Sequence, residues 1–332
     1  MQSDPTSDYA RGPRNMKDWR QVVPWIGAAA IVAGLACYLY INADRYISLL
    51  HVSAGGALAL FILSAAFPVF NGLINTYIFR VLGANLTHRE GFVVAASSTL
   101  VNLLPVPGGV LTRAVYLRHR HGLDYSKYVS AQLAFFVCSL GAYGLVGFIV
   151  LLYWALLRNL TVPPVLFAVF GLMIASLLMF SLPLEYLAAR TSKLVWLRQA
   201  IDGWLMVSKN PALLIQLLGL DGLALLFLAA RYWFAFHMLS QDVTPSQVLL
   251  FGASSILTQL VTFAPGGLGI REAIVGGLAS LLGFDPAVSV AALGLDWLVM
   301  IVVVLITGGL SMIYLGRQLS DAPSASAGPN EL

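Results

Sequence analysis

The sequence predicts an all-α membrane protein: a polytopic transmembrane helical bundle built as an inverted-topology repeat, with about six full spans and two re-entrant broken-helix hairpins. Three observations lead to this prediction. Hydrophobic residues make up 59% of the 332 residues and charged residues only 10%, whereas soluble domains are about 25% charged. Several apolar runs reach the roughly 20 residues that cross a bilayer. One unusual proline-glycine pattern also occurs twice along the chain.

Apolar runs of sufficient length predict the full spans at roughly 22–41, 55–80, 127–157, 162–182, 211–239 and 286–316. Two further apolar segments, 91–104 and 248–264, are too short to span comfortably. Both carry Ser, Thr, Asn or Gln, and both end at proline and glycine residues. We therefore expect each of them to enter the membrane, break, and leave on the side from which it came.

The two breaks are copies of one pattern. The stretch "SSTLVNLLPVPGGVLTRA" aligns with "SSILTQLVTFAPGGLGIREA", so that Pro107-Gly108-Gly109 matches Pro265-Gly266-Gly267 and Arg113 matches Arg271. Farther along, "GLDYSKYVSA" matches "GFDPAVSVAA". Each half then has an odd number of spans and one hairpin, so the second half is inverted relative to the first. Inverted repeats with broken helices near the midplane are a recurring plan of secondary transporters.

The positions of lysine and arginine predict the orientation. Under this arrangement most of the 19 basic residues lie on one side of the membrane, and only Arg45 and Arg158 fall on the other. Because basic residues concentrate in cytoplasmic segments, we expect a multi-pass protein of the cytoplasmic membrane with both termini in the cytoplasm.

The expected organisation has four parts. A polar cytoplasmic N-terminus is expected at 1–20 and a disordered cytoplasmic tail at 317–332. Between them we expect a first membrane repeat at 21–158 with a re-entrant segment at 91–121, and a second membrane repeat at 159–316 with a re-entrant segment at 247–284. No cleavable signal peptide is expected, because the first 20 residues are polar.

A cytoplasmic amphipathic linker is expected at 185–209, within the second repeat. Trp196, Leu197, Ile201 and Leu205 are close to helical spacing there, with basic residues interleaved. Such a helix either lies on an anionic lipid surface or packs on the protein.

Ionisable residues inside apolar segments are costly and mark candidate functional positions; here they are Asp221, Arg231, Arg271, Glu272 and Asp296. The helix after the second break is expected to start near Gly269-Ile270, where free N–H groups and the helix dipole favour an anion. A guanidinium in the first turn, that of Arg271, could add a bidentate contact to phosphate.

We therefore expect the phosphate of a lipid to be bound by one set of residues, namely Arg113, Arg231, Pro265, Gly266, Gly267, Gly269, Arg271 and Glu272. Asp221 and Asp296 would balance charge or carry a coupling proton. The alternative is that these residues form buried structural pairs, for instance Arg231 with Asp296, which fix helix packing.

Other kinds of site find little support. The histidines are scattered, so neither a metal nor another cofactor is expected. No strand precedes Gly267-Leu268-Gly269, which argues against a dinucleotide loop. We find no catalytic constellation and no basic patch for nucleic acid, and the oligomeric state stays open.

The two repeated regions, "PVPGGVLTRAVYLRHRHGLDYSKYVSA" and "FAPGGLGIREAIVGGLASLLGFDP", resemble the signature regions of the lysylphosphatidylglycerol synthase transmembrane region. That family also contains stand-alone, flippase-like membrane proteins. The resemblance covers most of residues 20–316 and departs at Thr112-Arg113-Ala114, where many relatives carry an acidic residue.

This resemblance implies lipid handling without aminoacyl transfer, because only a short polar tail follows the last span. The expected activity is translocation of an anionic phospholipid or a polyprenyl-phosphate-linked lipid. Two alternatives remain: a non-catalytic membrane partner of a glycosyltransferase or lipid synthase, and a membrane enzyme that acts on a lipid head group.

Overall fold

A computed structural model describes residues 54–103, 108–181, 195–260 and 270–320 of the chain. Within these ranges every regular element is a helix. Four helices are long and apolar enough to cross a membrane: α3 (Ala54–Val81), α6 (Tyr125–Leu157), α10 (Pro211–His237) and α13 (Pro286–Ser320). They confirm the spans predicted at 55–80, 127–157, 211–239 and 286–316.

The span predicted at 162–182 is less regular than expected. An α-helix, α7 (Pro164–Ala175), continues as a 3-10 helix, η1 (Ser176–Ser181), so the α-helical part is short. The Ser176 hydroxyl donates to the Met173 carbonyl over 2.6 Å and so binds a helix carbonyl at the change of helix type. The span predicted at 22–41 lies outside the described residues.

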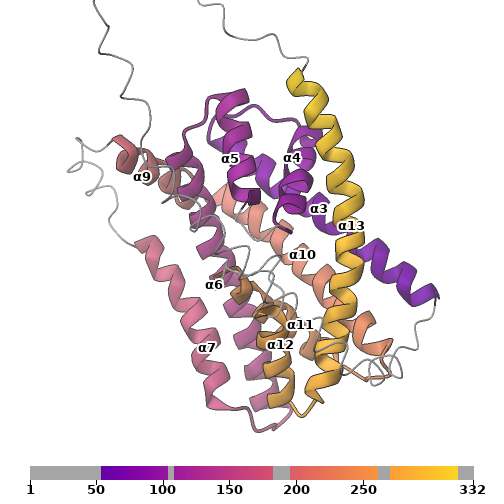
Figure 1. Cartoon of the computed structure of the whole chain (residues 1–332). Helices are drawn as coiled ribbons and strands as arrows, with labels where there is room; N and C mark the ends of the chain where they lie inside the picture. Colours follow the sequence, from indigo (N-terminus) through magenta and orange to yellow (C-terminus); the bar gives the residue numbers. More distant parts are fainter. Residues whose placement is uncertain (1–53, 104–107, 182–194, 261–269, 321–332) are drawn as a thin grey trace, which may run out of the picture.

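Each predicted hairpin contains two packed helices on either side of a break. The first pair is α4 (His88–Val101) with α5 (Gly108–His121), and the second is α11 (Pro245–Ser255) with α12 (Ile270–Leu281). A 3-10 helix, η2 (Ile256–Leu260), extends α11. In Figure 1, α4 and α5 lie at one end of the bundle, and α11 and α12 lie at the other.

The two halves also share their helix order and their contacts. α3, α4, α5 and α6 correspond in order to α10, α11, α12 and α13. α4 of the first half packs on α13 of the second, and α11 of the second packs on α6 of the first, while α3 and α10 pack together. The contacts between the halves are therefore reciprocal, as they are in an internal repeat.

The first legs of the two hairpins begin with the same local chemistry. Thr87 caps α4 by accepting from the Glu90 amide, and Thr244 caps α11 by accepting from the Gln247 amide in a capping box. Threonine at this position satisfies an amide that the helix leaves unpaired. α4 and α11 therefore begin with the same kind of cap.

Glycine and hydrogen bonds hold the first hairpin closed at both ends. At the break, the Gly109 amide donates to Asn102 Oδ1 over 2.8 Å. A Cβ at Gly109 would lie 2.2 Å from the Ser98 carbonyl oxygen, so only glycine fits there. At the other end, Glu90 Oε1 accepts from the Tyr116 hydroxyl over 2.6 Å and lies 3.0 Å from His121 Nε2.

The described part of the linker is α9 (Val195–Ser208), which packs on α6. Its buried face includes Ile201, Trp204 and Val207, whereas the side chain of Trp196 is 60% exposed. This helix packs on the protein, which is one of the two arrangements expected for the linker. Ile201 and Leu205 of the predicted apolar face lie in this contact, and Gly203 allows a close approach to the start of α6, where a Cβ would lie 2.2 Å from the Lys127 carbonyl oxygen.

Adjacent glycines on α13 provide a test of this packing. A Cβ at Gly308 would lie 2.6 Å from Leu100 Cβ and 2.9 Å from the Ala96 carbonyl oxygen, whereas a Cβ at Gly309 would meet nothing within 4 Å. We expect Gly308→Ala to lower the free energy of unfolding by about 1–3 kcal/mol through overpacking. Gly309→Ala should change it by about 0.5 kcal/mol at most. Thermal unfolding in detergent measures both, and equal effects would contradict the α4–α13 contact.

Candidate functional site

A fully buried carboxylate, that of Asp296 on α13, is the centre of the most strongly charged cluster in the described chain. Arg231 on α10 donates to it twice, from Nε to Oδ1 over 2.8 Å and from Nη2 to Oδ2 over 2.9 Å. This bidentate geometry is the strongest form of an arginine–carboxylate contact. It binds α10 to α13 at a point where neither charge meets water.

A second arginine reaches the same carboxylate from α12. Arg271 Nη1 donates to Asp296 Oδ2 over 3.1 Å, and Arg271 Nη2 donates to the Leu293 carbonyl over 2.9 Å. Because α12 begins at Ile270, as expected, Arg271 and the buried Glu272 lie in its first turn. Arg271 Nη2 is also 3.5 Å from Glu272 Oε1. Two guanidiniums thus face two carboxylates, and the cluster is formally neutral.

An aromatic residue extends this cluster to α11. Tyr232 follows Arg231 on α10, is almost fully buried, and shares a hydrogen bond of 2.8 Å with Ser255 Oγ. The Arg271 guanidinium carbon lies 6.0 Å from the centre of the Tyr232 ring. The ion cluster therefore joins α10, α12 and α13, and its aromatic neighbour adds α11.

The equivalent arginine of the first half has different partners. Arg113 on α5 donates from Nη1 to Asn75 Oδ1 over 2.9 Å, and Gln132 Nε2 donates to the same oxygen over 3.0 Å. Arg113 Nε is buried and has no hydrogen-bond partner. No carboxylate within the described ranges forms an ion pair with Arg113. Among the described residues, the acceptor that faces this guanidinium is the neutral Asn75 amide oxygen.

Hydrogen bonds among polar side chains of α3 and α4 orient Asn75 toward Arg113. Asn75 is buried on α3 and donates to the Asn71 carbonyl and to Asn71 Oδ1, each over 2.6 Å. Asn71 in turn donates from Nδ2 to Thr99 Oγ1 on α4 over 3.3 Å. These bonds orient the Asn75 side-chain oxygen toward both Arg113 and Gln132. The amide network thus draws on α3, α4, α5 and α6.

The two halves therefore place matching arginines in opposite electrostatic settings. Arg271 is neutralised by Asp296 and Glu272, whereas Arg113 keeps its charge. An uncompensated charge in a low-dielectric interior costs several kcal/mol. Arg113 is half-buried, so a bound anion would remove part of that cost without displacing a carboxylate of the described residues.

Asp221 on α10 does not join either cluster. Its Oδ1 accepts from the Tyr143 hydroxyl on α6 over 3.1 Å, and it forms no ion pair among the residues that the structure describes. Pro265, Gly266, Gly267 and Gly269 lie outside the described residues. Of the predicted set, the structure brings together Arg231, Arg271, Glu272 and Asp296, and it places Arg113 in a separate cluster.

Sequence reasoning missed the neutral members of both clusters. Asn75 and Gln132 are amides within otherwise apolar spans, and Tyr232 directly follows a charged residue in such a span. Polar groups in a membrane helix usually face a partner or a cavity, so Asn75 and Gln132 could have been found by that signal. In the ranges described, no three His, Cys, Asp or Glu side chains are grouped so as to hold a metal ion.

The sequence model of the lysylphosphatidylglycerol synthase TM region matches residues 17–308. The chain belongs to this family. It is a membrane protein of a family related to lipid handling, and the matched range includes Arg113, Arg271 and Asp296. No curated protein and no solved structure gives a significant match. The argument about activity therefore depends on the chemistry of the two clusters and on the family.

Removing the Asp296 charge should destabilise this family member strongly. Asp296→Asn leaves two buried arginines without their shared anion, and stranding a buried charge costs about 3–5 kcal/mol. Asp221→Asn is the matched control, because Asp221 neutralises no arginine in the described structure. We expect a much larger fall in thermal stability for Asp296→Asn. Equal falls would show that the ion cluster does not determine the stability of the bundle.

Proposed function

We propose that this protein translocates an anionic phospholipid or a polyprenyl-phosphate-linked lipid across the cytoplasmic membrane. The observation that carries the proposal is the Arg113 guanidinium, which donates to a neutral amide, that of Asn75, and has no carboxylate partner in the described chain. A phosphate is the complementary charge, and arginine matches its geometry with two parallel hydrogen bonds. A zwitterionic or neutral head group would offer less compensation.

The local backbone supports a phosphate near Arg113. α5 begins at Gly108, so its N-terminal end lies within the same hairpin as Arg113. The first amides of a helix and its dipole attract anions. One of these amides, that of Gly109, already donates to Asn102, and the arginine supplies the full positive charge.

The charged cluster of the second half supplies a site where an anion competes with a protein carboxylate. Arg231 holds Asp296 by two hydrogen bonds, whereas Arg271 holds it by one of 3.1 Å. Arg271 can therefore turn toward a lipid phosphate without leaving Asp296 unpaired. A head group that passes between the halves would meet Arg113, which pairs with no carboxylate of the described residues. It would also meet Arg271, which can exchange its hydrogen bond to Asp296 for one to the lipid phosphate.

The outer surface suits a substrate whose tails stay in the bilayer. Large apolar side chains are exposed on several helices, including Leu157, Leu172 and Ile215 at 73%, 75% and 72%. Such surfaces are unfavourable in water and are expected against lipid. The two hairpins lie at opposite ends of the bundle (Figure 1), so their arginine clusters would be met in turn by a head group that crosses it.

A reconstitution assay tests this proposal. With a fluorescent anionic lipid in vesicles, we expect Arg113→Gln to slow transbilayer movement about 10–100-fold, the range for losing one charge-assisted contact. Arg113→Lys should retain part of the rate. Arg118→Gln is the control, because Arg118 is exposed on the same helix and pairs with Asp124.

The same assay separates the alternatives. An unchanged rate for Arg113→Gln at equal protein level would overturn the assignment of the site. Chemical conversion of the head group would instead indicate a membrane enzyme. Movement that starts only when a glycosyltransferase or synthase is added would indicate a partner protein.

A further inference from the structure

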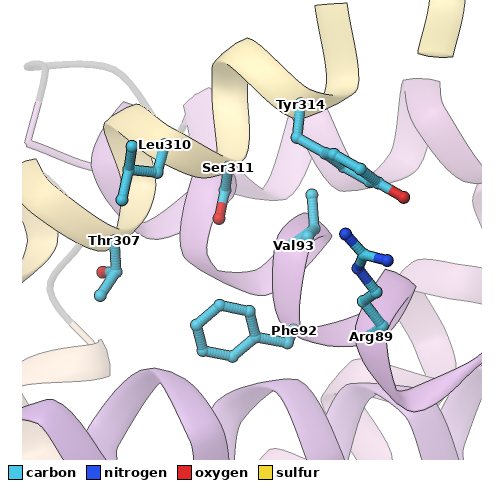
Figure 2. Close-up of a pocket in the computed structure, with 7 residues that line it drawn as sticks. All are labelled: Arg89, Phe92, Val93, Thr307, Leu310, Ser311 and Tyr314. Carbon is cyan, nitrogen blue, oxygen red and sulfur yellow. The ribbon is translucent and has the colours of Figure 1, made fainter. Parts of the chain in front are cut away.

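An open apolar groove runs between α4 and α13, apart from both arginine clusters. Its volume is about 330 Å³. Phe92 and Val93 line it from α4, and Thr307, Leu310 and Ser311 line it from α13 (Figure 2). A cavity of this size is at the lower end of ligand sites in proteins. It can take part of a lipid chain but is too small for a two-chain lipid.

A cation stands at the mouth of this groove. The exposed Arg89 side chain lies over the ring of Tyr314, with its guanidinium carbon 4.8 Å from the ring centre (Figure 2). No carboxylate in the described ranges forms an ion pair with Arg89. It occupies the first turn of α4, where the helix dipole disfavours a positive charge. An arginine at this position therefore does not stabilise α4 through the helix dipole.

The inner end of the groove is closed by close helix contact. Gly308 on α13 lies against Ala96 and Leu100 of α4, too close to admit a methyl group. The groove is thus bounded by this contact, and Arg89 in the first turn of α4 lines it as well. Its shape and charge suit an amphipathic ligand, with an anionic group outside and an apolar chain inside.

The corresponding contact in the other half lacks this cation. There α11 packs on α6, and Ser246 occupies the place in α11 that Arg89 occupies in α4, two residues after the threonine cap. Ser246 Oγ accepts a hydrogen bond of 3.0 Å from Nε1 of Trp154, whose side chain is buried. Among the described residues, the contact of α11 with α6 therefore has a serine where the contact of α4 with α13 has Arg89.

That end carries other basic residues as well. Arg118 and Arg120 lie in the last turn of α5, which packs beside α4. Basic residues gather at the cytoplasmic face of membrane proteins, where the anionic lipids of that leaflet are attracted by each nearby cation. The groove then faces the leaflet in which anionic lipid is most available.

We propose that this groove binds one anionic glycerophospholipid of the cytoplasmic leaflet, with its phosphate at Arg89 and one acyl chain between α4 and α13. The site is separate from Arg113 and Arg271, so it retains lipid whether or not the protein moves lipid. The membrane orientation used here is the one expected for the proposed function. Lipid binding in the groove, however, does not require that the protein transports lipid.

Native mass spectrometry of the purified full chain, after exposure to equimolar phosphatidylglycerol and phosphatidylcholine, tests the site. We expect the wild-type chain to retain phosphatidylglycerol preferentially, and Arg89→Gln to lower that preference about fivefold. Arg158→Gln is the control, because Arg158 is also exposed and also faces a tyrosine ring, that of Tyr153, at 5.9 Å. An unchanged preference in Arg89→Gln would overturn the assignment of the head group.

A second pair of variants tests the position of the chain. Leu310→Trp should fill the groove and reduce retention of both lipids, whereas Leu298→Trp on the same helix should not. Leu310 and Leu298 are 66% and 59% exposed, so neither substitution disturbs the core. Equal retention in these two variants would overturn the groove as the binding site. Retention by the groove without any lipid movement in vesicles would leave this site standing and contradict the proposed translocation alone.

Discussion

A carboxylate inside an apolar bundle must be neutralised, and Asp296 meets this requirement with arginines from two other helices. Arg231 fixes α10 against α13, and Arg271 fixes the start of α12 against the same carboxylate. Because α12 follows the second break, this interaction also determines where the broken chain resumes its helix. Apolar side chains of α11 and α12, such as Phe251 and Val275, pack in the same core, so the ion cluster and the apolar contacts together position the second hairpin.

The first hairpin is held in another way. Its legs are joined by the Gly109 amide at Asn102 and by Glu90 at the opposite end, and its arginine rests on neutral amides. The two halves thus share one order of helices but differ in their polar clusters. Carboxylates of the protein neutralise Arg271, whereas no carboxylate of the described residues pairs with Arg113. In the proposed mechanism this difference gives the lipid phosphate a preferred partner at Arg113 and a competing carboxylate at Arg271.

Hydropathy was sufficient to predict four of the long helices, because a bilayer-length apolar run has few other structures open to it. The two proline-glycine segments fall between α4 and α5 and between α11 and α12, while the re-entrant arrangement stays a prediction. The pairing of Arg231 with Asp296 was foreseen as the structural alternative to a role in binding. The network around Arg113 was not foreseen, since its acceptor Asn75 and the second donor to Asn75, Gln132, come from other helices and carry no charge. The change to a 3-10 helix at Ser176 follows an unbroken apolar run, which gives no signal of helix type. Of the apolar face predicted for α9, Ile201 is buried and Leu205 packs against the core, whereas Trp196 is exposed.

The most direct test of the central claim gives Arg113 the carboxylate that it lacks. Gln132 already points its amide at the oxygen that Arg113 binds, so Gln132→Glu would introduce an acid beside that guanidinium. The measurement is the rate of anionic lipid movement in vesicles, at equal amounts of folded protein. We expect Gln132→Glu nearly to abolish lipid movement, because the introduced carboxylate would take the place of the lipid phosphate at Arg113. An undiminished rate would contradict it, since Arg113 would then have no need of an external anion.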